Sequence, residues 1–287
     1  MPELPEVEVL KKSLNRNIKL VKIKKIKINN INLRFKVPKC LNKTFKGQII
    51  ENVSRISKYL ILHFKINKKI LIHLGMSGTI HLVKKKNHMK TNISFYNSFN
   101  LPKKHNHIEI TLNNNLKLIY NDPRRFGYFK IIRENFMNEP PLNKLGLDPF
   151  NLSFNFEYFQ NYTKNKKKNI KNLLMDQTFV CGIGNIYANE ILFYCNLSPF
   201  KNISKLNKKD IFLLLKNIKK ILKKAIFLGG STIRNFKKTD GKVGNFQQNF
   251  KVYGKDKTKC PKRDCDAYIK RIIISQRSTF YCPKCQN

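Results

Sequence analysis

The sequence is poor in acidic residues and contains no long apolar run. Only 17 Asp and Glu residues accompany 58 Lys and Arg residues, which gives the chain a formal net charge of +41 and an isoelectric point near 10.1. Because no run reaches about 18 apolar residues, no membrane-spanning helix is predicted. The hydrophobic fraction of 41% still suffices for a buried core, which excludes an intrinsically disordered chain.

The excess of positive charge favours a polyanionic partner, and nucleic acid is the default one. Genome composition is an alternative source of part of this excess, because Lys, Asn and Ile share A/T-rich codons. We therefore expect lysine runs such as 84–86 and 166–168 to be solvated surface, and we give more weight to the arginines.

The sequence shows neither a signal peptide nor a disulfide framework. It begins with residues 1–6, MPELPE, whose acidic character is the opposite of a secretory leader. Four of the seven cysteines lie beyond residue 259, and this clustering favours a metal site in a reducing compartment. The other three, Cys40, Cys181 and Cys195, lack ligand spacing, and we expect them to be packing residues. We predict a cytoplasmic protein.

An N-terminal helix and a series of short strands are predicted for the first half of the chain. Pro5 and Glu6 suit a first helical turn, where proline loses no hydrogen bond and an acidic side chain meets the positive end of the helix dipole. Alternating apolar residues then predict strands within 18–33, 49–54, 59–64, 69–73, 107–112, 116–120 and 126–132. Several short strands at close spacing predict a β-sandwich or barrel over residues 1–133.

The pattern changes in the second half of the chain. Proline and glycine gather in residues 134–150, which we predict to be a linker. Helical spacing beyond it, clearest in 206–228, predicts a helical domain over 151–249, which ends in a polar, glycine-bearing loop at 232–249. A cysteine-bearing segment, 250–287, completes a chain of the α+β class.

The clearest motif is Cys260-x4-Cys265-x16-Cys282-x2-Cys285. Two close cysteine pairs separated by a hairpin-length insert are typical of a tetrahedral zinc site, and four protein thiolates leave no open position for catalysis. We therefore predict one structural Zn²⁺. Arg277 falls near the tip of the intervening β-hairpin, where a guanidinium can grip a phosphate; a solvated surface arginine is the alternative.

The N-terminus is the second candidate site. Removal of Met1, which a small second residue allows, exposes the secondary amine of Pro2. An α-amino group has a pKa near 8, so about a tenth of it is free base at pH 7, far more than for a lysine. Such an amine can attack the anomeric carbon of a sugar and form an iminium, and Glu3 beside it can move a proton. An ordinary N-terminus that begins this way by chance is the alternative.

A series of motifs spans nearly the whole chain. They read MPELPEVE (1–8), SKYL (57–60), HLGMSG (73–78), KHNH (104–107), DPRRFG (122–127), LMDQ (174–177), GIGNIYANE (182–190), GGST (229–232) and QRSTFYCPKC (276–285). In this order they resemble the formamidopyrimidine-DNA glycosylase family. The resemblance implies an N-terminal β-sandwich preceded by a catalytic helix, a helix–two-turns–helix domain and a C-terminal zinc-finger β-hairpin, with DNA in the cleft between them.

The resemblance also implies the catalytic residues. Pro2 matches the family's Schiff-base nucleophile and Glu3 the acid that opens the deoxyribose ring. Lys58 matches the catalytic lysine, although its own surroundings in the sequence favour a surface position. Arg277 matches the finger arginine that grips phosphate and takes part in the final elimination. The loop 232–249 corresponds to the loop that caps the lesion.

Further residues match the family's contacts with DNA. Met76, Arg124 and Phe126 match the trio that fills the gap left by an extruded nucleotide, a step in which an apolar wedge offsets the cost of unstacking. From their own pattern, Met76 and Phe126 are expected in the core. Matches to DNA-contacting residues occur at His73, His105, Arg124, Arg125, Lys167 and Asn185.

The implied function is that of a bacterial glycosylase and abasic-site lyase that excises oxidised purines from damaged double-stranded DNA as a monomer. Two alternatives stay open: the related endonuclease VIII type, which prefers oxidised pyrimidines, and a non-catalytic basic zinc protein that binds nucleic acid. One departure from the family is the x4 spacing of Cys260 and Cys265, where x2 is usual. It leaves the orientation of the finger open.

Overall fold

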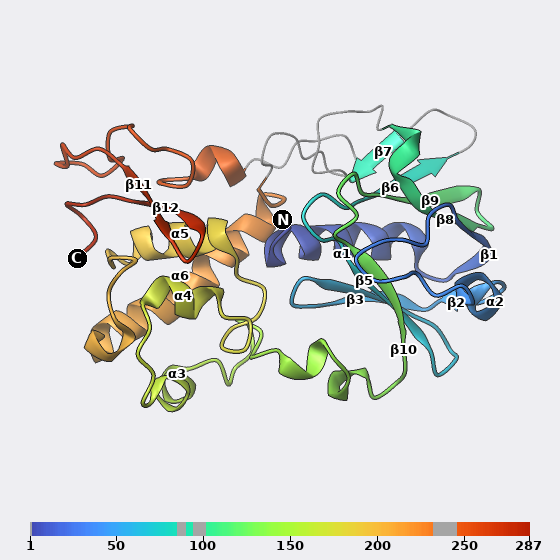
Figure 1. Cartoon of the computed structure of the whole chain (residues 1–287), viewed down its shortest axis with the longest axis horizontal. Coiled ribbons are helices and arrows are strands. Elements are labelled where there is room, and N and C mark those ends of the chain that lie inside the picture. The colour runs from blue at the N-terminus through green and yellow to red at the C-terminus, as the bar shows by residue number, and fades with distance from the viewer. Residues whose placement is uncertain (1, 85–89, 94–101, 232–245) are drawn as a thin grey trace. The chain divides into compact units, whose positions relative to one another are not determined.

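The computed structural model describes residues 2–84, 90–93, 102–231 and 246–287 (Figure 1). The chain divides into two compact units. The first comprises Met1–Asn143 with Ile226–Gln247, and the second Lys144–Ala225 with Gln248–Asn287. The division at 143/144 falls inside the proline-rich stretch, which contains the 3-10 turns η2 (Phe136–Asn138) and η3 (Leu142–Lys144).

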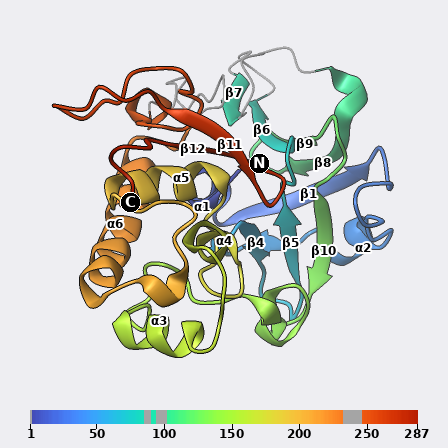
Figure 2. The same ribbon diagram turned by 60° about the vertical axis from the view of Figure 1, so that its left-hand side comes forward.

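The first unit consists of two antiparallel sheets and the N-terminal helix α1 (Leu4–Ile18). The larger sheet has the order β2-β1-β8-β9-β6-β7, and the smaller has the order β10-β5-β4-β3. Figure 2 shows β4, β5 and β10 of the smaller sheet side by side. The α+β class and the layered β arrangement predicted from the sequence are confirmed.

The strands of the larger sheet are β1 (Val21–Ile28), β2 (Ile49–Ile50), β6 (Thr79–Lys84), β7 (Lys90–Ile93), β8 (Asn106–Leu112) and β9 (Leu116–Asn121). Those of the smaller sheet are β3 (Asn52–Ile56), β4 (Tyr59–His63), β5 (Lys69–His73) and β10 (Tyr128–Ile132). Strands β6 and β7 and the short helix α2 (Leu41–Phe45) were not expected, because their neighbourhood is dominated by glycine, lysine and asparagine.

Helix α1 packs against β3 and β4 and shares one hydrophobic core with both sheets. Its buried apolar face includes Val7, Leu10 and Leu14, which recur in the sequence at helical spacing. This burial fixes the start of the helix, and with it the N-terminal residues, against the β structure.

The second unit contains the helices α3 (Phe156–Thr163), α4 (Ile170–Met175), α5 (Asn185–Tyr194) and most of α6 (Lys208–Phe227), with the 3-10 turn η4 (Ile203–Lys205). Its two strands, β11 (Lys270–Ile274) and β12 (Arg277–Tyr281), form an antiparallel hairpin. The turn η5 (Phe246–Asn249) replaces the end of the expected 232–249 loop. The rest of that loop, 232–245, lies outside the described residues.

Two of the three cysteines without ligand spacing are packing residues, since Cys181 and Cys195 are buried. The expectation was wrong for Cys40, which is exposed at the N-terminus of α2. Among the described residues, no helix has the length and apolar content needed to cross a membrane.

Candidate functional site

The start of α1 places Pro2 and Glu3 together in a buried environment. Glu3 is the N-cap, with an extended backbone, and only 2% of it is exposed. A capping box joins Glu3 and Glu6, in which the Glu3 side chain accepts from the backbone N–H of Glu6. In return, Oε2 of Glu6 accepts from the backbone N–H of Glu3 at 2.9 Å. The backbone that carries the candidate nucleophile is therefore held from both sides.

Glu6 extends this arrangement to a distant part of the same unit. Its Oε1 accepts hydrogen bonds from the backbone N–H of Ser231 at 2.7 Å and from the Ser231 hydroxyl at 2.8 Å. Gly230 before it has φ +82°, and a Cβ there would lie 3.2 Å from Oε1 of Glu6. The sequence gave no sign that Glu6 contacts Ser231.

Lys58 lies in the two-residue turn between β3 and β4 and is buried, with 7% of it exposed. Ser57, its partner in the turn, has φ +53°. Arg55 donates from a terminal guanidinium nitrogen to the Ser57 carbonyl at 2.9 Å and from Nε to the Glu8 carboxylate at 2.8 Å. One guanidinium therefore connects the lysine turn to α1. The surface position that the local sequence favoured for Lys58 was wrong.

The charge of Glu8 completes this connection. Burial by itself raises the pKa of Glu8, but hydrogen bonds from Lys11 and Arg55, together with their charges, outweigh burial and leave the pKa below its ordinary value. Glu8 is therefore an anion at neutral pH, paired with Arg55 over 2.8 Å.

His73 ends β5 and is a neutral imidazole at physiological pH. Burial, with the nearby charges of Lys58 and Arg34, lowers the pKa of His73 to about 4. Its Nδ1 accepts from the backbone N–H of Gly75 at 3.2 Å, so the ring proton resides on Nε2, which can donate. The ring stacks on Tyr128, with centroids 5.2 Å apart. This arrangement suits donation of one hydrogen bond to an anionic ligand.

Met76, Arg124 and Phe126, which we call the wedge, lie on two loops of the first unit. Met76 is 41% and Phe126 is 42% exposed, and the core positions expected from their sequence pattern were wrong. The Arg124 guanidinium lies over the Phe126 ring, 4.6 Å from its centroid. A pocket beside them is lined by Asn32, Leu33, Arg34, Arg124, Arg125 and Phe126.

His105 and Lys167, two further predicted DNA contacts, lie in a short turn and on the surface, respectively. His105 is half-buried in the 3-10 turn η1 (Lys103–His105), and its backbone carbonyl accepts from the N–H of Asp122 at 3.0 Å. Partial burial and the charge of Lys104 lower its pKa. Lys167 is exposed just before α4.

The finger hairpin of the second unit is held by α4 and α5. Nζ of Lys171 donates to the Thr279 hydroxyl at 2.6 Å and to the Ser278 carbonyl at 3.3 Å. Nδ2 of Asn185 donates to the same carbonyl at 2.9 Å. Exposed Arg277 begins β12 beside these contacts. Burial, with the charge of Arg277, lowers the pKa of Lys171 to about 8. Lys171 was not among the predicted site residues, although it ends the same basic run as Lys167.

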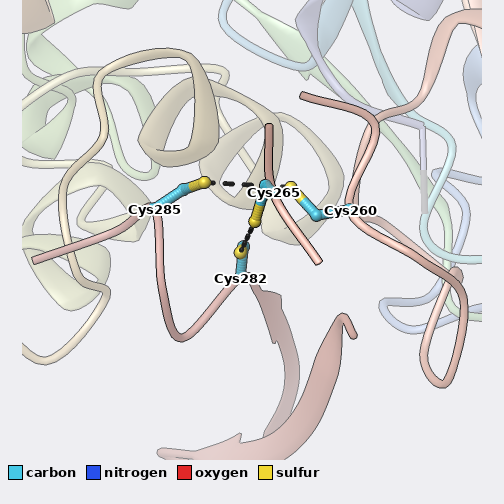
Figure 3. A group of neighbouring side chains, drawn as sticks. All are labelled: Cys260, Cys265, Cys282 and Cys285. Carbon is cyan, nitrogen blue, oxygen red and sulfur yellow. Dashed lines mark hydrogen bonds between the residues drawn. The ribbon is translucent and has the colours of Figure 1, made fainter. Parts of the chain in front are cut away.

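The four finger cysteines converge on one point, as Figure 3 shows. Their sulfur atoms all lie within 4.8 Å of one another, with 3.9 Å between Cys260 and Cys285 and 3.6 Å between Cys265 and Cys282. Tetrahedral Zn–S bonds of about 2.3 Å require sulfur atoms about 3.8 Å apart. The thiols therefore fit a zinc ion. The longer first knuckle closes with Asp264 at φ +59°.

Sequence profiles of known families match nearly the whole chain. The formamidopyrimidine-DNA glycosylase N-terminal domain matches residues 1–129, the H2TH domain of the same enzyme matches 145–237, and a zinc finger found in FPG and IleRS matches 258–287. Proteins named formamidopyrimidine-DNA glycosylase are similar over their full length. The one from the Wolbachia of Brugia malayi is 38% identical, covering 100% of both chains, and that of Histophilus somni is 41% identical, covering 100% of this chain and 99% of the relative.

Solved structures agree with these matches. The Lactococcus lactis Fpg bound to DNA containing an abasic site superposes with a TM-score of 0.86 at 33% identity, covering 99% of each chain. The same enzyme bound to DNA containing N7-benzyl-Fapy-dG also gives a TM-score of 0.86 at 33% identity, covering 100% of each.

Proposed function

The chain belongs to the formamidopyrimidine-DNA glycosylase family, and from this membership we propose how its own residues carry out the reaction. It is a DNA glycosylase and abasic-site lyase of base excision repair that acts on oxidised purines in double-stranded DNA. The main support for these roles is that Pro2 and Glu3 lie next to each other at the buried start of α1.

The amine of Pro2, freed by removal of Met1, is the nucleophile. It attacks C1′ of the damaged nucleotide, and the bond from C1′ to the base breaks as the base takes the proton that the Pro2 nitrogen loses. The ring oxygen then leaves C1′ as Glu3 protonates it. The product is an iminium between Pro2 and the opened sugar. The capping box with Glu6 fixes the carboxyl group of Glu3, which supplies this proton.

The iminium acidifies the neighbouring sugar positions, so successive eliminations cut the strand on both sides of the lost base. Lys58 and Arg277 assist at the sugar and phosphate. Lys58 is fixed by the Arg55 contacts within the first unit, and Arg277 is presented at the tip of a hairpin held by Lys171 and Asn185.

The remaining site residues bind the DNA backbone or fill the gap in the DNA duplex. Neutral His73 donates one hydrogen bond to a phosphate, and Arg125, His105, Lys167 and Asn185 add further phosphate contacts. Met76, Arg124 and Phe126 occupy the space left by the extruded nucleotide, and their exposure supports this role. One structural Zn²⁺ held by the four finger cysteines stabilises the hairpin.

Two further assignments complete the proposal. The enzyme acts as a monomer in the cytoplasm, where zinc thiolates stay reduced. Its functional regions are the catalytic helix and sandwich (1–133), a linker (134–150), the helix–two-turns–helix region with the capping loop (151–249) and the zinc finger (250–287).

Borohydride trapping tests the nucleophile and the substrate class together. Duplexes containing 8-oxoguanine opposite cytosine are compared with duplexes containing thymine glycol. We expect a covalent adduct chiefly on the first. A preference for thymine glycol supports the endonuclease VIII type, and binding without an adduct on either supports a non-catalytic protein. The L. lactis enzyme has itself been captured on DNA containing an oxidised pyrimidine, so both arms are needed.

The variant Pro2→Gly assigns the nucleophile. It should lose most excision and keep its DNA affinity, whereas Pro102→Gly, a change at an exposed proline, should behave as the unaltered protein. Near-normal excision by Pro2→Gly would remove Pro2 from the mechanism. Intact mass shows whether Met1 has been removed.

A further inference from the structure

One buried carboxylate contacts both loops that carry the wedge. We propose that Asp122 is a positioning residue, which fixes Met76 and the Arg124–Phe126 segment in the geometry needed to enter opened DNA. This inference rests on the proposed function of the wedge. It assigns no direct contact with DNA to Asp122, which is completely buried (0% exposed).

The two oxygens of Asp122 have separate partners. Oδ1 accepts from the hydroxyl of Ser77, the residue after Met76, and from the backbone N–H of Arg124 at 3.2 Å. Oδ2 accepts from the backbone N–H of Gly127 at 2.9 Å and from the Tyr120 hydroxyl at 2.9 Å. The carboxylate therefore holds the loop after Met76 and both ends of the Arg124–Phe126 segment.

The backbones of the two loops pack closely against each other. Gly75 has φ +63°, and a Cβ there would overlap the backbone of Phe126. A Cβ on Gly127 would overlap the hydroxyl of Tyr120. Only glycine permits this approach, and the approach brings the donors of both loops within reach of one carboxylate.

Four donors contact the Asp122 carboxylate. They are the hydroxyls of Ser77 and Tyr120 and the backbone N–H groups of Arg124 and Gly127, and together they occupy both carboxylate oxygens. The pKa of Tyr120 is raised far above its ordinary value by burial, by the charge of Asp122 and by the hydrogen bond to it. Tyr120 thus remains a donor throughout the physiological range.

The functional consequence concerns the cost of opening the helix. Extruding a nucleotide breaks its stacking, and inserted side chains offset that loss only if they are already in place. Met76 and Phe126 are large apolar side chains held in solvent, so their geometry depends on the loop backbone beneath them. Fixing both loops through Asp122 pre-orders the wedge before DNA arrives.

Asp122→Asn tests the proposal with little change in volume. An amide has one acceptor oxygen, so it cannot accept from both the Gly127 and the Arg124 sides. Single-turnover excision of 8-oxoguanine from a duplex should fall by about tenfold or more. Strand cleavage at an abasic site in single-stranded DNA, which needs no wedge, should change by less than about twofold. Glu134→Gln, an exposed carboxylate of the same unit, is the matched control.

The comparison of substrates separates positioning from folding. An equal loss on both DNAs, or no loss on either, would overturn the proposal. If the unaltered protein cleaves neither, the proposed function fails instead. If Asp122→Asn unfolds the protein, the milder variant Ser77→Ala is used instead, because it removes only one donor to the carboxylate. Ser77→Ala should lower duplex excision by about threefold and leave single-strand cleavage unchanged. Any other pattern for this variant contradicts the positioning role of Asp122. A 2-aminopurine beside the lesion becomes more fluorescent when it is unstacked, so it reports insertion of the wedge directly. The increase in fluorescence on protein binding should be smaller for both variants than for the unaltered protein.

Discussion

A single oxygen of Glu6, Oε1, accepts two hydrogen bonds from Ser231, one from its backbone at 2.7 Å and one from its hydroxyl at 2.8 Å. The other oxygen holds the backbone of Glu3 at 2.9 Å. Residues 225 positions apart in sequence are thereby joined through one carboxylate. The contact holds Ser231 at the start of α1.

Substitutions at Glu6 and Ser231 should have unequal effects. Ser231→Ala removes one hydroxyl donor and should cost about 1 kcal/mol of unfolding free energy, whereas Glu6→Gln, whose amide has one acceptor oxygen for three donors, should cost about 2 kcal/mol. Urea unfolding measures both values. We also expect Glu6→Gln to slow 8-oxoguanine excision more than Ser231→Ala does, because only Glu6 holds the Glu3 backbone. Equal losses of excision in the two variants would show that the hydrogen bond from Glu3 to Glu6 contributes nothing to catalysis.

Arg55 should be essential for the placement of Lys58. Its guanidinium reaches Glu8 and the Ser57 carbonyl from different nitrogens, which an ammonium cannot reproduce. Arg55→Lys should therefore lower strand cleavage at abasic sites by about tenfold. Arg133→Lys, at an exposed position, serves as the control. Full cleavage by Arg55→Lys would mean that the turn holds Lys58 without help.

The sequence predicted the periodic parts of the fold well. The apolar face of Val7, Leu10 and Leu14 and the alternation in most strands are local signals, and the structure follows them. The cysteine spacing likewise predicted a metal site, because the ligands come from two short segments. Met76 and Phe126 are exposed although their apolar character alone predicts core positions, so hydrophobicity by itself misplaced them.

Residues that act through distant partners could not be identified from the sequence. Asp122 has its partner Ser77 45 positions away, and Lys171 reaches Thr279 across 108 positions. Asp122 begins the DPRRFG motif and Lys171 ends a basic run, but neither pattern indicates that the side chain is buried against a partner so far away in the sequence. The loops and hairpins that bring these partners together become visible only in three dimensions.

Lys171 should give the protein a distinctive pH dependence. The pKa of this fully buried group is lowered to about 8, from an ordinary value near 10.5, first by burial and then by the charge of Arg277. Below pH 8 both folded and unfolded chains carry the proton, and burial of the charge is unfavourable. Between about pH 8 and 10.5 the unfolded chain binds more protons, so the contribution of Lys171 to stability rises with pH.

Lys171→Met isolates this contribution. Relative to that variant, the unfolding free energy of the unaltered protein should climb between about pH 8 and pH 10.5, as measured by urea unfolding at each pH. Over the same range its affinity for DNA containing an abasic analogue should fall more steeply than that of the variant, because a positive charge beside Arg277 is lost. Parallel stability curves would indicate that Lys171 titrates as an ordinary surface lysine.

Removal of zinc should disable the finger hairpin. The small core around it contains three of the ligand cysteines, Cys260, Cys265 and Cys282, packed with residues such as Val252 and Phe280. A core of this size depends on the metal, since zinc binding supplies folding free energy in small finger domains. The hairpin carries Arg277, so its loss would remove the phosphate contact proposed for that residue.

We therefore expect one zinc per chain, released by a strong chelator with a parallel fall in DNA affinity and strand cleavage. Cys265→Ser should reproduce this result, because an alcohol is a poor zinc ligand. Cys40→Ser changes an exposed cysteine outside the cluster and should retain both zinc and activity. The zinc-free protein should keep the melting transition of the first unit, whose core is separate from the finger. Undiminished DNA binding by zinc-free protein would show that the hairpin holds Arg277 in place through the Lys171 and Asn185 contacts alone.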